Sequence, residues 1–341
     1  MKALFIHGRQ DLREADVEIP EPGEGQVRLR MAFGGICGSD LHYYHEGANG
    51  AFVVREPLIP GHEVSGVVDH DPAGRLAAGT PVTLHPATFG DSQPGIETQP
   101  HLWPNGAYLG SASTWPHTQG GMSEYLLVDA GMIRVLPEGL SLQRAALAEP
   151  LAVGLHGINV AGGVEGKRVL VCGSGPIGLL AAAAALAKGA AEVTATDVLE
   201  GPLERARALG VTRTLQIGTD ELPAEAFDVV LECSGVPASI DGAIAAVRRA
   251  GVIAQIGMMG SGPQPVSLAA LIAKEAQLRG CFRFNQEIDE AIALLAADAR
   301  FDRVITHVLP ATDAEAAFAA AKDSQASGKV LVELWPDHDR H

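Results

Sequence analysis

The stretch VLVCGSGPIG (169–178) runs from four apolar residues of strand type into three glycines spaced as GxGxxG. An alanine-rich helical pattern follows it. This order is typical of a dinucleotide-binding turn. Gly173 permits the tight turn, Gly175 lets the backbone approach a pyrophosphate, and Gly178 lets the helix pack closely on the strand. The free N–H groups at the start of the helix would then face the phosphates.

Asp197 is the second part of this pattern. It ends the next strand segment 19 residues after Gly178, which is where a carboxylate hydrogen-bonds the adenosine ribose. Because this carboxylate would repel a 2′-phosphate, the pattern predicts NAD as the cofactor, with NADP as the less favoured alternative.

Around the glycine loop, strand and helix patterns alternate from about residue 151 to residue 283. The paired segments are KRVLVCG with PIGLLAAAAALAKG, AEVTATD with PLERARALG, AFDVVLECSG with ASIDGAIAAVRRAG, and VIAQIGM with SLAALIAKEAQ. Such alternation predicts an α/β fold with a doubly wound parallel sheet, the Rossmann type of cofactor domain.

The front of the chain has a different texture. It consists of short strand patterns separated by turn residues: KALFIHG, QVRLRMAFGGI, HEVSGVVDHD, TPVTLHPA and SEYLLVD. The tail mixes helices (288–298 and 313–324) with strands (305–309 and KVLVELW), and we expect it to return to the front. The predicted domains are a β-rich catalytic domain (1–150 and 284–341) and a dinucleotide-binding domain (151–283). We expect the ligand cleft between them.

Composition narrows the classes of partner. The chain has 341 residues, 47% of them apolar, and a formal net charge of −16. This charge argues against nucleic acid and anionic membrane surfaces, and it favours a small-molecule ligand. The longest apolar run (177–187) is too short to cross a bilayer, and the first twenty residues do not resemble a signal peptide. We therefore expect a cytoplasmic protein whose four dispersed cysteines form no disulfide framework.

Three groups of metal-ligand type lie far apart in the sequence. Cys37 lies in GGICGSDLHYYHEG (34–47), His62 and Glu63 follow a Pro-Gly pair, and Glu149 stands where the texture changes. Thiolate, imidazole and carboxylate are ligands that zinc prefers, and a catalytic zinc leaves one position open. Taken singly, each residue is more often a packed or surface side chain. A hydride acceptor on the glycine loop needs a Lewis acid beside it, and this need joins the groups into one candidate site.

Six motifs occur in the order found in one family: GICGSD, PGHEVSGVV, AEPLAVGLH, GxGPIG, DVVLECSG and LRGCFRF. With them the chain resembles the medium-chain zinc-dependent dehydrogenases, sorbitol/polyol branch, over nearly its whole length. The resemblance implies a GroES-like catalytic domain and an NAD-linked enzyme that interconverts a secondary alcohol and its ketone. GSASTWPHTQGG and KEAQLRGCFRF are most similar to the L-idonate dehydrogenase type, which implies oxidation of L-idonate to 5-ketogluconate.

The resemblance also implies roles for individual residues. The implied zinc ligands are Cys37 and His62, with Glu63 and Glu149 as acidic ligands, or one of them as a ligand and the other holding the water. Asp40 would orient His62 through the second ring nitrogen, and Ser39 would begin the proton relay. Tyr43 and Arg283 would face the substrate. The implied dinucleotide contacts are Gly173, Gly175, Pro176, Ile177, Gly178, Asp197, Cys233, Ile256, Gly257, Met258, Phe282 and Arg283.

One departure from the family concerns a second zinc. Many relatives hold a structural zinc with four closely spaced cysteines, whereas the loop 89–121 of this chain contains no cysteine. We therefore expect one zinc per subunit, in a homodimer or homotetramer. The substrate would be an aldonate such as idonate or, alternatively, a polyol of the sorbitol or xylitol type. A non-catalytic NAD-binding sensor protein is a more distant alternative.

Overall fold

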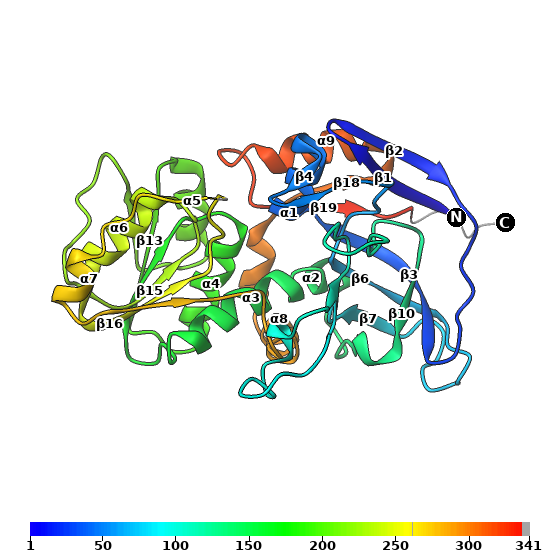
Figure 1. Ribbon diagram of the computed structural model, residues 1–341, viewed down its shortest axis with the longest axis horizontal. Helices are drawn as coiled ribbons and strands as arrows, with labels where there is room; N and C mark the ends of the chain where they lie inside the picture. Colours follow the sequence, from blue (N-terminus) through cyan, green and yellow to red (C-terminus); the bar gives the residue numbers. More distant parts are fainter. Residues whose placement is uncertain (261, 336–341) are drawn as a thin grey trace.

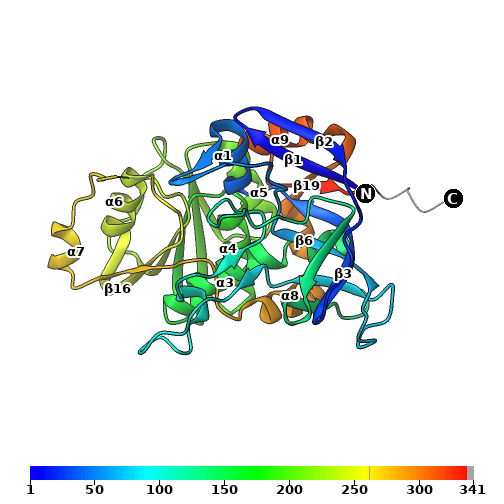
Figure 2. The same cartoon turned by 45° about the vertical axis from the view of Figure 1, so that its right-hand side comes forward.

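Two β-sheets organise the chain in the computed structural model, which describes residues 1–260 and 262–335 (Figure 1). One sheet is parallel, and together with its helices it is called the parallel-sheet lobe below. The other sheet is mixed, and with its helices and loops it is called the mixed-sheet lobe. Helix α3 (Ala148–Val160) lies between the lobes in both views (Figures 1 and 2).

The parallel sheet has the strand order β14-β13-β12-β15-β16-β17, and all of its pairings are parallel. Its strands are β12 (Arg168–Cys172), β13 (Glu192–Asp197), β14 (Arg213–Gln216), β15 (Phe227–Glu232), β16 (Val247–Gln255) and β17 (Gln277–Gly280). The connecting helices are α4 (Pro176–Ala187), α5 (Glu200–Ala208), α6 (Pro237–Ala246) and α7 (Ala269–Ala273). The chain order reverses between β12 and β15, and ligands of such sheets bind beyond the carboxyl ends of the strands at this point. The predicted doubly wound parallel sheet is confirmed.

The mixed sheet has the order β11-β7-β6-β3-β19-β18, with β10 also paired to β3. Its strands are β3 (Gln26–Gly35), β6 (Glu63–His70), β7 (Pro81–Leu84), β10 (Tyr125–Asp129), β11 (Ile133–Val135), β18 (Ile305–Pro310) and β19 (Lys329–Glu333). Because β19 pairs with β3, the tail of the chain completes a sheet that the front begins. The expectation that the tail returns to the front is confirmed.

The remaining elements lie outside the two main sheets. The strands are β1 (Lys2–Gly8), β2 (Asp11–Asp16), β4 (Ala48–Asn49), β5 (Phe52–Val53), β8 (Ala87–Thr88) and β9 (Ala107–Tyr108). The α-helices are α1 (Gly38–Glu46), α2 (Leu142–Ala145), α8 (Ile288–Ala297) and α9 (Ala314–Lys322). The 3-10 helices are η1 (Pro100–Leu102), η2 (Ala130–Met132), η3 (Ala299–Val304) and η4 (Ala311–Asp313).

Several elements differ from the expectations. Helix α1 interrupts the region that reads as β, and β14 has no counterpart among the predicted strands. The pattern 238–251 predicts one long helix, but α6 ends at Ala246 because β16 begins to pair with Phe227 at the next residue. Helix α7 has only five residues.

The junction between the lobes is continuous. Helix α3 runs unbroken across the predicted boundary at residue 150, and α8 shares a buried apolar cluster with α3 and α4. The predicted limits, 1–150 with 284–341 and 151–283, therefore remain a proposal. No helix among the described residues is long and apolar enough to cross a membrane.

Candidate active site

Two neighbouring strands bring the predicted ligands together. Strand β3 ends at Gly35, two residues before Cys37, and β6 begins at Glu63, directly after His62. Gly35 and Glu63 face each other in the antiparallel pair, where a Cβ on Gly35 would lie 2.2 Å from Glu63 Oε2. Only glycine allows this approach. The ligand atoms of Cys37, His62 and Glu63 consequently lie within 4.8 Å of one another.

Asp40 holds the backbone of both ligand-bearing segments. Its buried carboxylate accepts the N–H of Cys37 at 2.9 Å and the N–H of Gly61 at 3.2 Å. The expected hydrogen bond from a ring N–H of His62 to the carboxylate of Asp40 does not occur in the described part of the chain. Both carboxylate oxygens are engaged by backbone donors, so Asp40 acts on His62 through its charge and through the position of Gly61.

The imidazole of His62 lies among acidic groups. Burial lowers its pKa, but the neighbouring Cys37, Asp40 and Glu149 outweigh burial and raise this pKa to about 10. His62 Nδ1 is buried and has no hydrogen-bond partner among the described residues. A half-buried thiol with a buried imidazole and a buried carboxylate, surrounded by further acids, forms a donor set that fits a zinc ion. The residues present therefore suit the metal that the sequence predicts.

The two acidic candidates have different partners. Both oxygens of Glu63 accept hydrogen bonds from Lys329 Nζ, at 2.7 and 2.5 Å, and Nζ also donates to the carbonyl of Ile36 at 3.0 Å. Glu149, in the first turn of α3, instead accepts a hydrogen bond from the hydroxyl of Tyr108 at 2.5 Å. Burial raises the pKa of Glu149, although His62 opposes this shift. Glu149 lies outside the 4.8 Å group but acts on it electrostatically.

The two predicted substrate residues lie close to this cluster. Tyr43 is buried in α1, and its hydroxyl accepts the N–H of Ala112 at 3.0 Å, so it anchors the loop above the site. Arg283 has a positive φ of 51° and holds its guanidinium carbon 3.9 Å from the centre of the Tyr108 ring. It makes no hydrogen bond or ion pair with any described residue. Ser39 is half-buried in the first turn of α1.

The glycine loop has the geometry that the sequence predicts. Gly173 has a φ of 85°, and a Cβ on Gly178 would lie 1.8 Å from the Gly173 carbonyl oxygen. A Cβ on Gly175 would meet no atom within 4 Å, so the space in front of its backbone is open. Pro176 and Ile177 follow in the first turn of α4, beside this open space. The cradle fits a pyrophosphate at a helix N-terminus.

Asp197 lies at the carboxyl end of β13, next to that loop. Its carboxylate accepts the N–H of Ser174 at 2.8 Å and the N–H of Leu199 at 3.0 Å. These bonds hold the acid at the edge of the cradle. This place is compatible with a ribose hydroxyl as a further partner.

The other predicted cofactor residues follow β15, β16 and β17. Gly257 lies so close to the preceding loop that a Cβ would meet Gly235 N at 2.2 Å. Ile256 packs against Gly157 of α3, where a Cβ would lie 2.2 Å from Ile256 Cδ1. Met258 and Phe282 are 77% and 40% exposed, so both present apolar surface, although the guanidinium of Arg283 lies 4.9 Å from the centre of the Phe282 ring. Cys233 is half-buried, and burial raises the pKa of its thiol.

Two residues of the site were missed by the sequence reasoning. Lys329 is the first residue of β19 and is 2% exposed. The sequence signal for a buried lysine was its position at the start of the apolar segment KVLVELW. Tyr108 lies in the two-residue strand β9 of the loop 89–121, where no motif or periodicity singles it out. The four cysteines are free thiols, in agreement with the expectation.

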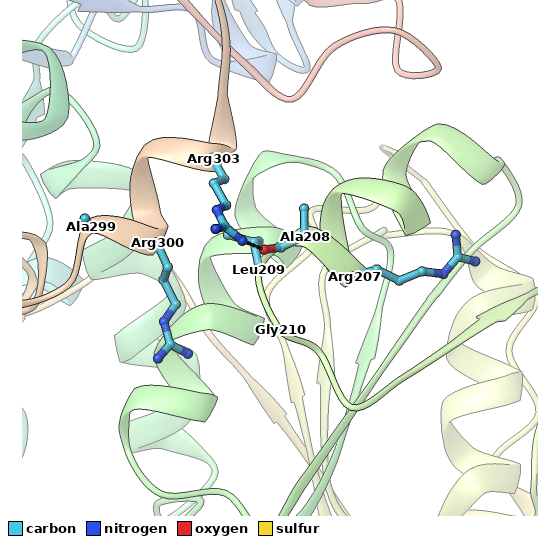
Figure 3. A pocket seen from close by; sticks show the side chains of 7 residues that line it. All are labelled: Arg207, Ala208, Leu209, Gly210, Ala299, Arg300 and Arg303. Carbon is cyan, nitrogen blue, oxygen red and sulfur yellow. Dashed lines mark hydrogen bonds between the residues drawn. The ribbon is translucent and has the colours of Figure 1, made fainter.

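A hollow on the protein surface lies away from this cluster, at the carboxyl end of α5. Arg207, Ala208, Leu209, Gly210, Ala299, Arg300 and Arg303 line it (Figure 3). Its arginines have partners already: Arg207 pairs with Glu200, Arg300 pairs with Asp298, and Arg303 donates to the Ala208 carbonyl. The helix end also presents carbonyl oxygens, which disfavour an anion. This hollow is therefore separate from the candidate active site.

A half-buried thiol grouped with a buried imidazole and carboxylate, in a chain that also has a dinucleotide cradle, defines the class of a zinc-binding dehydrogenase. Comparison with known sequences agrees: residues 176–297 match the zinc-binding dehydrogenase family, and residues 23–138 match the alcohol dehydrogenase GroES-like domain. The chain is 35% identical to sorbitol dehydrogenase of Macaca fascicularis, over 98% of this chain and 96% of the relative. It is 36% identical to L-idonate 5-dehydrogenase (NAD(P)(+)) of Escherichia coli (strain K12), over 97% and 98%.

Among solved structures, the crystal structure of L-idonate 5-dehydrogenase from Escherichia coli superposes with a TM-score of 0.92 at 32% identity, and 97% of each chain is covered. The chain belongs to the zinc-dependent medium-chain dehydrogenase family. It is an oxidoreductase that acts on CH–OH donors with a nicotinamide cofactor, built from a GroES-like domain and a Rossmann-type domain. The predicted family, fold class and enzyme class are confirmed.

Proposed function

We propose that this enzyme oxidises a secondary alcohol of a polyhydroxylated small molecule, with L-idonate converted to 5-ketogluconate as the first choice. The observation that supports an acid is Arg283, a largely enclosed guanidinium beside the metal-type cluster that has no carboxylate partner among the described residues. Burial lowers its pKa, and Tyr108, Glu149 and Tyr43 oppose this shift. A substrate carboxylate would supply the missing counter-charge in bidentate form.

A neutral polyol is the alternative substrate. The five N–H donors of a guanidinium can also bind neighbouring hydroxyl groups. The relatives support both choices, because sorbitol dehydrogenase and L-idonate 5-dehydrogenase match at similar identity. The net charge of −16 disfavours an anion at long range, so an acid would depend on the local cation more than a polyol would.

We propose that one zinc ion per subunit is held by Cys37 and His62, with Glu63 and Glu149 as the acidic groups. Such a zinc supplies a Lewis acid that lowers the pKa of the substrate hydroxyl, and a bound nicotinamide accepts the hydride. Residues 89–121 contain no cysteine and therefore cannot provide a four-cysteine structural site. A metal assay that finds two tightly bound zinc ions per subunit would contradict this proposal.

The chain's own residues have the following proposed tasks. Ser39, half-buried above the cluster, takes the proton of the substrate hydroxyl and passes it toward solvent. Arg283 holds the far end of the substrate, which fixes the carbon that loses its hydride. Lys329 keeps Glu63 in place beneath the cluster. Tyr43 and Ala112 hold the loop that covers the site, and this cover excludes water.

We propose NAD as the preferred cofactor, with NADP less favoured. Asp197 carries a negative charge at the edge of the cradle, and its position is held by two backbone N–H groups. The 2′-phosphate of NADP would bring a second negative charge to this place. Similar proteins differ on this point: one is named as NAD(P)(+)-linked, one neighbour of known structure is described as bound to NADP, and another is described as complexed with NADH.

The proposed assembly is a homodimer or homotetramer, and the proposed location is the cytoplasm. The edge strand β17 and the adjacent helix α7 expose Leu268, Ile272 and Leu278, which are 47%, 75% and 39% exposed. An apolar edge of this kind is covered in many proteins by a second copy. Light scattering that finds a monomer at assay concentration would contradict the proposed assembly.

The test of the proposed function is NADH formation with L-idonate, D-gluconate, L-iditol, sorbitol and xylitol, with and without a zinc chelator. We expect chelator-sensitive turnover, with L-idonate as the best substrate. The variant Arg283→Gln should raise the KM for L-idonate at least about tenfold and affect neutral polyols less, because it removes a charge-assisted contact. Equal turnover of L-idonate by Arg283→Gln and the parent would exclude the acid as the substrate that this site selects.

A further inference from the structure

Tyr108 lies where three groups of the candidate active site meet. Its side chain is 5% exposed, and its hydroxyl donates to Glu149 Oε1 at 2.5 Å. Its ring face carries the guanidinium of Arg283 at 3.9 Å, and its ring meets the ring of His62 at 5.4 Å with an interplanar angle of 62°. One side chain thus contacts a carboxyl group, a guanidinium and an imidazole at the same time.

These contacts place a neutral side chain between opposite charges. Burial lowers the pKa of Arg283 and Glu149 opposes this shift, yet the two side chains form no ion pair within 4.0 Å among the described residues. Tyr108 gives Glu149 a neutral O–H donor and gives Arg283 a neutral aromatic face. A cation over an aromatic ring is stabilised without using its N–H donors. The donors of Arg283 therefore remain available for a ligand.

The loop around Tyr108 is built to hold it still. Strand β9 pairs with β8 through Thr88 and Ala107. A Cβ on Gly90 would lie 1.8 Å from the carbonyl oxygen of Pro104, so the two arms of the loop touch through backbone atoms. Asn105 adds a hydrogen bond to Asp91 at 2.8 Å. The loop is closed by its own backbone contacts, and this closure fixes the position of the tyrosine.

We propose that Tyr108 is a positioning residue that separates Glu149 from Arg283, so that Glu149 stays with the metal cluster and Arg283 stays free for the substrate. The proposal concerns the geometry of the site. It rests on the proposed function only where it assigns an oxygen-rich, preferably carboxylate-bearing substrate to Arg283. Without the hydroxyl, Glu149 loses its neutral donor, and the positive charges left to compensate it are His62, Lys329, a bound metal ion and Arg283.

The first test compares Tyr108→Phe with the parent in protein reconstituted with Co²⁺. Phenylalanine keeps the ring against Arg283 and His62 but removes the bond to Glu149. We expect the visible d–d bands of the cobalt protein to change in energy and intensity, because a released Glu149 alters the set of ligands. Loss of groups that orient metal ligands commonly changes metal affinity or activity 10- to 100-fold, and we expect cobalt and zinc affinities to change within that range.

The second test is kinetic and uses the same variant. If Glu149 moves to Arg283, the KM for L-idonate should rise about 10- to 100-fold while kcat for a neutral polyol changes less. Tyr108→Leu, which also removes the aromatic face, should raise this KM further. Tyr125→Phe is the matched control, because its ring carries Arg28 at 5.6 Å far from the cluster and its variant should behave as the parent.

The outcomes separate the two proposals. An unchanged cobalt spectrum together with an unchanged KM in Tyr108→Phe would overturn the positioning role. An equal loss of kcat on acids and polyols, with the cobalt spectrum unchanged, would also overturn it and would leave only a structural role. If the parent turns over none of the sugar acids or polyols, the proposed function fails, and the cobalt spectrum and metal affinity of Tyr108→Phe then decide the positioning role alone.

Discussion

Replacing Lys329 by methionine should destabilise the metal-free protein far more than the zinc-loaded protein. The side chains of Lys329 and Glu63 are 2% and 0% exposed, and Nζ bonds both carboxylate oxygens at 2.7 and 2.5 Å. Methionine keeps most of the side-chain volume but leaves Glu63 buried without its cation. Removal of one partner from a buried ion pair costs about 3–5 kcal/mol.

This cost can be expressed as a melting temperature. An unfolding entropy of roughly 2 cal/mol/K per residue makes 1 kcal/mol equal to about 1.4 °C for a chain of this length, so the metal-free variant should melt about 4–7 °C below the parent. A divalent cation among Cys37, His62 and Glu63 restores a positive charge next to the carboxylate. The zinc-loaded variant should therefore lose about half as much or less. By linkage, its apparent affinity for zinc should rise at least about tenfold.

Calorimetry with and without a chelator, combined with a zinc competition assay, measures both quantities. Lys274→Met is the matched control, because the Nζ of this buried lysine donates to three backbone carbonyls at 2.7, 2.7 and 2.9 Å. Lys274→Met should lower the melting temperature by the same amount in the metal-free and the zinc-loaded protein. The pair Lys329→Met with Glu63→Gln should recover most of the loss in the metal-free protein. Equal shifts of the two metal states in Lys329→Met, or none, would refute the electrostatic reasoning.

Three further variants test other parts of the structure. Gly178→Ala should weaken NADH binding at least about tenfold, measured by fluorescence titration. The Cβ of the alanine would lie 1.8 Å from the Gly173 carbonyl oxygen, so the turn would have to open. Unchanged binding would contradict this close approach. Asp197→Ser should raise the ratio of kcat/KM for NADP over NAD about tenfold or more, since it removes a like charge from the 2′-phosphate; an unchanged ratio would show that this acid does not select the cofactor. Glu287 has a pKa of about 2, because hydrogen bonds from His156 and Asn159 outweigh the opposing effect of burial. Because this pKa is lower in the folded state than in the unfolded state, ionised Glu287 stabilises the fold at pH values above about 4.5. This stabilisation is lost as the pH falls toward 2. The melting temperature of Glu287→Gln should accordingly lie below that of the parent at pH 6 and converge with it near pH 2, and a gap that does not vary with pH would argue against the low pKa.

Much of the fold could be predicted because its signals are local. The glycine loop needs three glycines within six residues, and the alternation of strands and helices follows from periodicity in short windows. The candidate ligands Cys37 and His62 were instead predicted from the family resemblance, because their spacing forms no local motif. The structure brings them within 4.8 Å of Glu63 because β3 and β6 are neighbours in an antiparallel pair.

The parts that could not be predicted depend on contacts between distant segments. Helix α1 follows the glycine-rich end of β3 and begins with a hydrogen bond from the Cys37 N–H to the Asp40 carboxylate, and this sequence is equally typical of a loop. Lys329 is 266 residues from its partner Glu63, and Tyr108 is 41 residues from Glu149. Neither pairing has a periodicity or spacing rule. Tertiary packing alone decides which buried polar groups meet.

Helix α3 connects the candidate metal site with the predicted cofactor site and fixes the distance between them. Glu149 in its first turn is a proposed acidic group of the metal site, and Gly157, eight residues later, packs against Ile256 of the predicted cofactor wall. Eight helical residues span about 12 Å, and a single inserted residue would turn one end against the other by about 100°. Chimaeras that exchange cofactor lobes between relatives should therefore be spliced outside residues 148–160. A splice within residues 148–160 would change the orientation of the alcohol relative to the nicotinamide, even if both lobes fold.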